Sequence, residues 1–443
     1  MSYDLLGNYI SIDDAKNNPL FSRDYDYGEL LSNKDKLSDE WKSLRQEEKE
    51  KFNNSIKVFY ERNKLIDPSS SIVSSSKNYY LLDNEINERI SNPPEFKLLL
   101  LDGLHYEDSL MELVENIENI DQIKELYKLR KKTVGRSKNA GISADEALRL
   151  RNCMRQGREL YQTGKVGSLM VKPLNYFYSI TAYAYSIIIL NNPVRYSLNT
   201  LPGSHGVNYI PDGMKIQFGG DMPHGTFSDL FCSFPTFQIK NNELDIIQEN
   251  TESIMTFFHK RNTVNVGTLM SMIPEIRDYY KLVSGESSKT YPLQIIMTRD
   301  ARNVKWEFQI GDGETKPNVG GVQSSFQGFN VSERHGKYLI DVPASEVHKI
   351  KASIFTDIKG DLWYIDNPFF PIVLPEVCIH FLLTNIFSNL MRYTPHNWGE
   401  VLLNEVNSNW SLITRKYLSA FESKFPQIVL KSLSKYYPYV IGG

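Results

Sequence analysis

The sequence PLNYFYSITAYAYSIIILNNPV, residues 173–194, has no charged side chain in 22 positions. Five of its residues are aromatic, namely Tyr176, Phe177, Tyr178, Tyr183 and Tyr185. Proline suits the first turn of a helix and stops one that reaches it, so Pro173 and Asn191-Asn192-Pro193 predict the two ends of a helix. A membrane-spanning helix needs about 20 mostly apolar residues. The four tyrosine hydroxyls favour instead a buried helix in a soluble core.

A second apolar stretch, residues 372–391, is interrupted by a proline and several polar residues: Pro375, Glu376, His380, Thr384, Asn385 and Ser388. These interruptions also favour a buried helix over a membrane span. We expect the two stretches to pack together as the central core, with no membrane insertion.

A strongly basic segment, residues 128–172, lies immediately before the tyrosine-rich stretch. It holds twelve Lys or Arg against three acids, a charge of +9 in a chain whose formal total is −3. The rest of the chain therefore sums to −12. An asymmetry of this size bears on the choice of partners.

The basic segment divides into a basic run and a predicted helix. Ser143-x-x-Glu146 is a capping-box pattern that opens the helix, and Thr163-Gly164 is expected to close it. Within it, Arg151, Arg155 and Arg158 follow i, i+4, i+7 spacing and share one face. The predicted nucleic-acid-binding residues are Lys128, Arg130, Lys131, Lys132, Arg136, Lys138, Arg151, Arg155, Arg158 and Lys172.

This segment has three interpretations. The basic residues could follow a phosphate backbone while neighbouring tyrosines stack on unpaired bases. Alternatively, the arginines pair with acids of the same chain and the tyrosines belong to the core. A protein partner is the third possibility.

The remaining patterns predict an α+β protein, with two helical blocks, N- and C-terminal, around a mid-chain antiparallel β region. Helices are expected at 38–60 and 107–129 and, after Pro371, through Tyr437. Strands are expected at 214–218, 229–239, 293–297, 304–310, 338–342, 352–356 and 362–365, with hairpin turns at 311–313 and 359–360. The predicted regions are 1–142, 143–290, 291–366 and 367–443.

Arg392 and His396 follow the second apolar stretch as Arg-Tyr-Thr-Pro-His. They resemble the Arg-x(4–6)-His signature of HEPN ribonucleases, in which the His is the acid/base and the Arg stabilises phosphate charge. The spacing here is one residue short of that pattern. The alternative, which we favour, is an Arg that caps the carbonyls of a helix end and a surface His.

Other candidate chemistry is weaker. His205 and His224, each followed by glycine and close to Asp212 and Asp221, could bind a metal or act as acid and base, but turn formation explains them as well. Asp312-x-Glu314-x-Lys316 imitates a nuclease core, although the flanking glycines indicate a turn. The sequence has no phosphate-binding loop, dinucleotide fingerprint, His-Glu-x-x-His or Gly-x-Ser-x-Gly motif. We therefore predict neither a metal nor a cofactor.

The three cysteines are far apart, which favours a reducing compartment over a disulfide framework. The first 16 residues contain no apolar signal segment. Both features predict a cytoplasmic protein.

Several segments, taken in order, resemble the bacterial YaaC-like family. They are Phe52-Asn-Asn-Ser-Ile-Lys-Val-Phe-Tyr60, Asn152-Cys-Met-Arg-Gln156, Lys172-Pro-Leu-Asn-Tyr-Phe-Tyr178, His205-Gly206, and Leu374-Pro375 through Ser388-Asn-Leu-Met-Arg-Tyr393 and Trp398. The resemblance spans about residues 40–435, while Asn175 and Asn389 depart from the family pattern. It implies a bacterial cytoplasmic protein and a fold, and no substrate.

The function we expect is a non-catalytic cytoplasmic protein that binds a polyanion, foremost nucleic acid, in a bacterial stress or phage-defence system. Two other classes stay open. One is an enzyme, either a metal-independent ribonuclease using Arg392 and His396 or a hydrolase around His205 and His224. The other is a protein–protein scaffold, and the oligomeric state is left open in every case.

Overall fold

The structure is a computed structural model. It describes residues 2–3, 9–10, 97–102, 106–133, 141–192, 195–218, 225–234, 263–300, 303–343, 346, 349–403, 410–434 and 436–441. The helix expected at 38–60 lies outside these residues. The described elements before residue 106 are three strands: β1 (Ser2–Tyr3), β2 (Tyr9–Ile10) and β3 (Lys97–Asp102).

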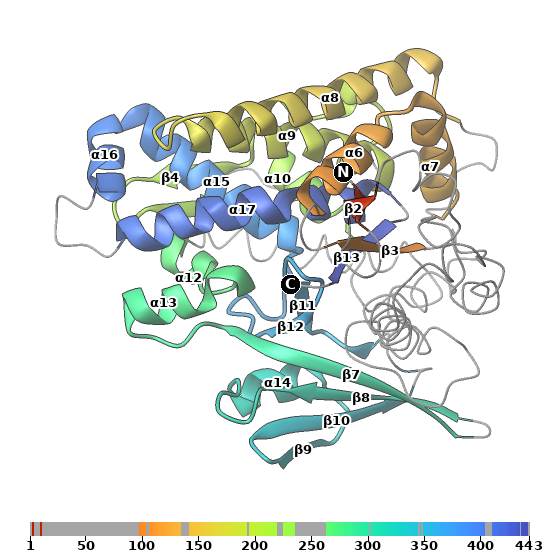
Figure 1. Cartoon of the computed structure of the whole chain (residues 1–443), viewed down its shortest axis with the longest axis vertical. Helices are drawn as coiled ribbons and strands as arrows, with labels where there is room; N and C mark the ends of the chain where they lie inside the picture. The colour runs from red at the N-terminus through yellow and green to blue at the C-terminus, as the bar shows by residue number, and fades with distance from the viewer. Residues whose placement is uncertain are drawn as a thin grey trace.

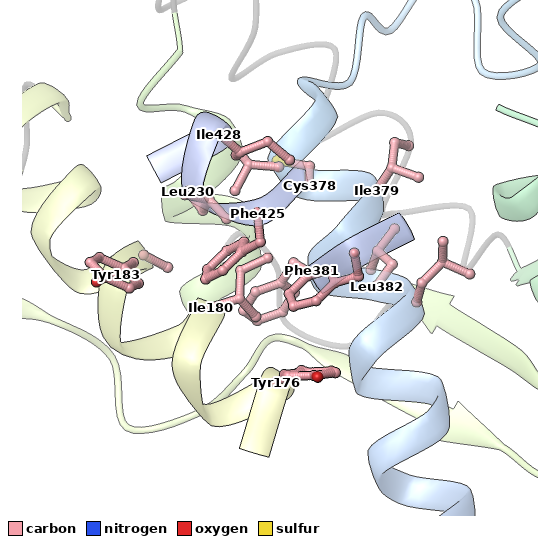
Figure 2. Packing of buried hydrophobic residues seen from close by; sticks show 14 of the residues in the cluster. Tyr176, Ile180, Tyr183, Leu230, Cys378, Ile379, Phe381, Leu382, Phe425 and Ile428 are labelled. Atoms are coloured by element: carbon pink, nitrogen blue, oxygen red, sulfur yellow. The ribbon is translucent and has the colours of Figure 1, made fainter. Parts of the chain in front are cut away.

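Four long helices lie side by side and form the helical core (Figure 1). They are α8 (Ala144–Val166), α9 (Lys172–Asn191), α15 (Glu376–Tyr393) and α17 (Trp410–Leu433). Ile180 of α9, Phe381 of α15 and Phe425 of α17 meet in the apolar interior (Figure 2). The prediction that the two apolar stretches pack together is confirmed. No helix in the described part of the chain is long and apolar enough to cross a membrane.

Two glycines allow α8 and α9 to approach closely. A β-carbon at Gly157 would lie 2.7 Å from the Tyr183 ring, and one at Gly164 would lie 2.4 Å from the Tyr176 ring. The Ser179 hydroxyl donates to the Gly157 carbonyl at 2.7 Å across the same contact. The rings of α9 therefore occupy the volume that side chains of α8 leave free.

The ends of α8 and α9 match the prediction in part. Ser143 caps α8 by accepting from the Glu146 N–H at 3.1 Å, but the Glu146 carboxylate accepts from the Leu198 N–H instead of closing the capping box. The predicted end of α8 at Thr163-Gly164 is wrong, because the helix continues to Val166 and is capped at Gly167. The end of α9 at Asn191 agrees with the prediction.

The single helix predicted at 107–129 is two helices, α6 (Tyr106–Asn116) and α7 (Ile120–Thr133). The Asn119 side chain starts the second one by accepting from the Asp121 N–H at 2.8 Å. This break leaves Glu118 in the connection, where it faces α8.

A six-stranded antiparallel sheet has the order β11-β12-β7-β8-β10-β9 and its own hydrophobic core. Its strands are β7 (Thr290–Asp300), β8 (Asn303–Ile310), β9 (Val331–Arg334), β10 (Lys337–Pro343), β11 (Ser353–Thr356) and β12 (Leu362–Ile365). All five strands predicted between 293 and 365 are present, and Gly360 closes the predicted β11–β12 hairpin with a φ of 94°. The predicted hairpin at 311–313 is wrong, because the chain there leads into α14 (Val319–Ser325).

Shorter elements complete the fold: η2 (Leu198–Thr200), α10 (Thr226–Phe231), α12 (Val266–Met270), η3 (Pro274–Ile276), α13 (Arg277–Ser284) and α16 (Pro395–Leu403). A three-stranded sheet contains β4 (Val207–Ile210), β5 (Lys215–Phe218) and β6 (Thr263–Asn265). The strand predicted at 229–239 is wrong as far as 234, since α10 and a turn occupy those residues.

The helix expected through Tyr437 ends at Leu433, and β13 (Tyr436–Ile441) instead pairs in parallel with β3. Helical blocks on both sides of the antiparallel mid-chain sheets confirm the α+β class.

Candidate functional site

The N-terminal part of the predicted nucleic-acid-binding segment lies on and after α7. Lys128 is exposed on that helix, and Arg130, Lys131 and Lys132 lie in its last turn. Arg136 and Lys138 lie outside the described residues. The structure therefore leaves the basic run at 128–138 as a prediction.

The arginines of α8 have different surroundings although they share a helix face. Arg158 is buried, and its Nε and Nη2 donate to the two Glu118 carboxylate oxygens at 2.6 and 3.2 Å. Glu118 raises the pKa of Arg158 further through this pair. Arg155 is 55% exposed with carboxylates only at 3.9 and 4.0 Å, and the half-buried Arg151 donates to Asn152 at 3.4 Å. Arg158 is thus an internal ion-pair partner and is unavailable to a phosphate.

Lys172 is likewise engaged within the chain. Its Nζ lies 2.5 Å from Glu422 Oε1 and donates to the Lys165 carbonyl at 2.9 Å. The Tyr176 hydroxyl donates to the same Glu422 oxygen at 2.5 Å. Burial, followed by this hydrogen bond, raises the pKa of Tyr176 far above its usual value. The alternative interpretation, internal pairing and core tyrosines, therefore describes Arg158, Lys172 and Tyr176.

Arg392 has a different environment, in the last turn of α15. Its Nη1 donates to the Tyr178 hydroxyl at 3.3 Å and its Nη2 to Asn389 Oδ1 at 3.3 Å. The guanidinium carbon also lies 4.9 Å from the centre of the Tyr393 ring. All three partners are neutral, so the described contacts of Arg392 leave its charge uncompensated. Its buried Nε has no hydrogen-bond partner among the described residues.

His205 belongs to the same cluster as Arg392. Its ring packs edge-on against Phe177 with 4.9 Å between ring centres, and within the described part of the chain its buried Nδ1 has no hydrogen-bond partner. Burial lowers the pKa of His205, and the positive charge of Arg392 lowers it further. His205 is therefore neutral at pH 7. We call Arg392, His205, Tyr178 and Tyr393 the Arg392 cluster.

A contact between two glycines holds the loop that carries His205. The Phe227 N–H donates to the His205 carbonyl at 3.0 Å. A β-carbon at Gly225 would lie 2.2 Å from the Gly206 α-carbon, and Gly225 has a φ of 133°. Both predicted His-Gly pairs thus contribute their glycine to one contact, while His224 itself lies outside the described residues.

The predicted pair of Arg392 and His396 is not joined by any contact between described residues. His396 lies exposed in the first turn of α16, beyond Pro395, whereas Arg392 turns toward α9. Within the described ranges, no group of three or more His, Cys, Asp or Glu is arranged to hold a metal ion. Asp312, of the nuclease-like motif, accepts from Thr315 and Arg277 in a turn.

Sequence reasoning did not find that Tyr393, Tyr178 and His205 converge on Arg392. The available signal was Asn385, Asn389 and Arg392 at i, i+4 and i+7 within an apolar stretch, a polar row that a core helix does not need. Asn389, which departs from the family pattern, accepts a hydrogen bond from Arg392 through its side chain.

The fold and this cluster define an α+β protein whose helical core carries a cation beside exposed rings. The model of the YaaC-like protein family matches residues 115–433, and the chain belongs to this family. That range includes every member of the Arg392 cluster. No curated protein and no solved structure matches the chain.

Proposed function

We propose that this protein binds a phosphate-bearing polyanion, specifically single-stranded nucleic acid, through the Arg392 cluster. The observation that carries the proposal is the neutral surroundings of the Arg392 guanidinium. Arg158, Lys165 and Lys172 each lie within 2.6 Å of a carboxylate oxygen, whereas Arg392 contacts a phenol, an amide and a ring. A cation with neutral partners attracts an anion more strongly than one that is already paired.

Exposed aromatic rings support a ligand with unpaired bases. Tyr393 is 68% exposed and Tyr178 is 38% exposed, and both contact Arg392. Proteins that bind single strands combine a cationic groove with such rings, and each stacked base contributes about 1–3 kcal/mol. Duplex DNA keeps its bases stacked inside the helix, so it would be attracted by the charge of Arg392 alone and would not stack on the rings.

The unpartnered atoms of the cluster favour a ligand that supplies hydrogen-bond acceptors. Arg392 Nε is an obligatory donor that has no partner in the described ranges, and His205 Nδ1 has none there either. Leaving a buried polar group unpaired costs about 1–3 kcal/mol. Phosphate oxygens are acceptors for both groups once the imidazole is protonated.

The wider setting belongs to the same proposal. A bacterial cytoplasmic location, in a stress or phage-defence system, rests on the family resemblance and the sparse cysteines. A scaffold role is the second candidate, and internal neutralisation of Arg158 and Lys172 favours it, because a paired basic row does not track a phosphate backbone.

Fluorescence anisotropy with a labelled 20-nucleotide pyrimidine single strand and the matching duplex tests the proposal. Tyr393→Ala should weaken single-strand binding by about tenfold through lost stacking. Arg392→Gln should reduce the slope of log K against log salt by about 0.7. Arg334→Gln, on the exposed edge strand β9, is the matched control and should change neither. No binding at low salt, or equal losses in all three variants, contradicts the proposal and leaves the scaffold role.

A further inference from the structure

The junction between the helical core and the six-stranded sheet contains a buried group of charges. Strand β11 contributes Phe355 to the helical core and Ile354 to the sheet core, so it is shared by both. Its four residues are all buried. The contacts that hold β11 therefore contribute to the attachment of the sheet to the helical core.

Lys424 of α17 lies at this junction and is fully buried. Its Nζ is 3.4 Å from Glu275 of η3 and 3.3 Å from Glu376 in the first turn of α15. It also donates to the carbonyl oxygen of Thr356, the last residue of β11. We call Lys424, Glu275, Glu376 and Thr356 the Lys424 node; it joins four elements that are far apart in the chain.

Each segment that packs around Lys424 contributes a charged group. Glu275 and Glu376 place two carboxylates against one buried ammonium, and Lys431 donates to the Thr356 hydroxyl. Asp357 adds negative charge, although its carboxylate accepts from the Lys359 and Asp361 N–H groups and the Trp363 ring N–H. His380 of α15 is close enough to the node for the charge of Lys424 to lower its pKa.

Glu275 is the group in the node with the fewest hydrogen bonds to its polar atoms. Both of its carboxylate oxygens are buried and accept no hydrogen bond from the residues that the structure describes. Burial raises the pKa of Glu275 to about 7; Lys424 opposes this rise and Glu376 reinforces it. Burial alone would lower the pKa of Lys424, but Glu376 and Glu275 raise it above its usual value. Lys424 therefore stays charged while Glu275 exchanges its proton near neutral pH.

We propose that the Lys424 node is a proton-sensitive joint between the sheet and the helical core. With Glu275 protonated, one ammonium faces one carboxylate and β11 is held firmly. When Glu275 releases its proton to solvent, a second buried carboxylate repels Glu376, and β11 with β12 opens more often. The proposal is independent of the Arg392 cluster.

The sign of the effect follows from the two states of Glu275. In the closed joint its pKa is about 7, and in an open, hydrated joint it returns toward the ordinary 4.5. The stabilisation is complete below the lower value and is lost as pH rises through the higher one. The opening equilibrium constant should therefore rise by up to about tenfold per pH unit across that window.

Hydrogen–deuterium exchange at pH 5 and pH 7.5, corrected for intrinsic rates, tests the joint. In the wild type, amides of β11 and β12 should lose protection at the higher pH relative to the β8–β10 pair. Glu275→Gln keeps the shape without a titrating carboxyl and should remove that difference. Glu333→Gln, a surface carboxyl on β9 paired with Lys316, is the control and should behave as the wild type.

Glu376→Gln provides a second, independent variant, because loss of the repelling carboxylate should shift the transition to lower pH. Burial and Lys424 lower the pKa of His380 to about 3, so its contribution to stability rises with pH, opposite to that of Glu275. The pH dependence of each variant is therefore compared with that of the wild type, which shares His380. The infrared band of a protonated carboxyl should be present in the wild type at pH 6 and missing in Glu275→Gln. Equal β11 protection at both pH values in the wild type overturns the proposal, as does unchanged pH dependence in Glu275→Gln.

Discussion

Arg392 and Tyr178 lie 214 positions apart in the chain, and Arg392 Nη1 donates a 3.3 Å hydrogen bond to the Tyr178 hydroxyl. The bond connects the last turn of α15 to the second turn of α9, the two helices of the central core. It also holds the guanidinium beside an exposed ring. The cluster is therefore built on rigid elements, which suits a site that must be preorganised.

Replacement of the two residues in the predicted HEPN-like pair should have unequal effects. Arg392→Ala should lower the free energy of unfolding by about 1 kcal/mol, because two partly exposed hydrogen bonds are lost. His396→Ala should change it by less than about 0.5 kcal/mol, since the side chain is exposed. Urea denaturation measures both. RNA cleavage that His396→Ala abolishes without a change in stability would establish the ribonuclease alternative instead.

Arg158 and Arg155, one helical turn apart, should respond differently to alanine. Arg158→Ala leaves Glu118 buried without its partner and should cost about 3 kcal/mol. Arg155→Ala removes only long ion pairs, at 3.9 and 4.0 Å, from a largely exposed side chain and should cost less than about 0.5 kcal/mol. Chemical denaturation of both variants checks this. Equal costs would mean that the Arg158–Glu118 pair is not formed in solution.

Alanine at Gly157 should destabilise the protein although alanine favours helices. Its β-carbon would lie 2.7 Å from the Tyr183 ring, and such overpacking costs about 1–3 kcal/mol. Gly399→Ala in α16 is the matched control, because nothing lies within 4 Å of the new β-carbon. It should stabilise by about 0.5–1 kcal/mol through helix propensity. Thermal unfolding of the pair separates packing from propensity.

His380 should make the protein sensitive to acid. Burial and then Lys424 lower its pKa to about 3, below the usual 6.5, so the unfolded chain takes up a proton that the folded one does not. The contribution of His380 to the free energy of unfolding is complete above pH 6.5. Below that pH it falls by up to about 1.4 kcal/mol per pH unit. The stability difference between wild type and His380→Gln should shrink as pH falls from 6.5 to 4.5. A difference that stays constant contradicts a neutral buried His380.

Binding of a phosphate-bearing strand should be tighter at pH 5.5 than at pH 7.5. Burial lowers the pKa of His205, and the positive charge of Arg392 lowers it further. A bound phosphate offsets that charge, so binding favours the protonated imidazole. Anisotropy titrations at pH 5.5 and 7.5 measure the change, and His205→Gln should remove it. Equal pH dependence in that variant would exclude His205 from the site.

The helical core could be predicted because its signals are local. Ser143 caps α8 by its own side chain, and Pro173 and Asn191 delimit α9 whatever lies around them. The strands between 290 and 365 follow from their β-branched and aromatic runs. In these segments local preference and tertiary packing agree.

Long-range contacts account for what could not be predicted. The break at Asn119 is stabilised by Glu118 meeting Arg158, 40 positions away. Strand β13 needs β3, more than 300 residues earlier, as its pairing partner. In sequence Lys424 resembles a surface lysine of α17, and its burial is compensated by Glu275, Glu376 and the Thr356 carbonyl, which come from other elements.

Three consecutive rings of α9 face three different surroundings. Tyr176 packs against Phe421 at a tilt and donates to Glu422. Phe177 contacts His205 and Phe381, and Tyr178 accepts from Arg392 at the surface. Each residue of an α-helix is rotated by about 100° from the one before it. A single inserted residue before Tyr176 would therefore place a phenol hydroxyl in the apolar interior and an apolar ring at the surface. Substitutions along α9 test one contact at a time, whereas a change in its length would misplace the core and the proposed binding surface together.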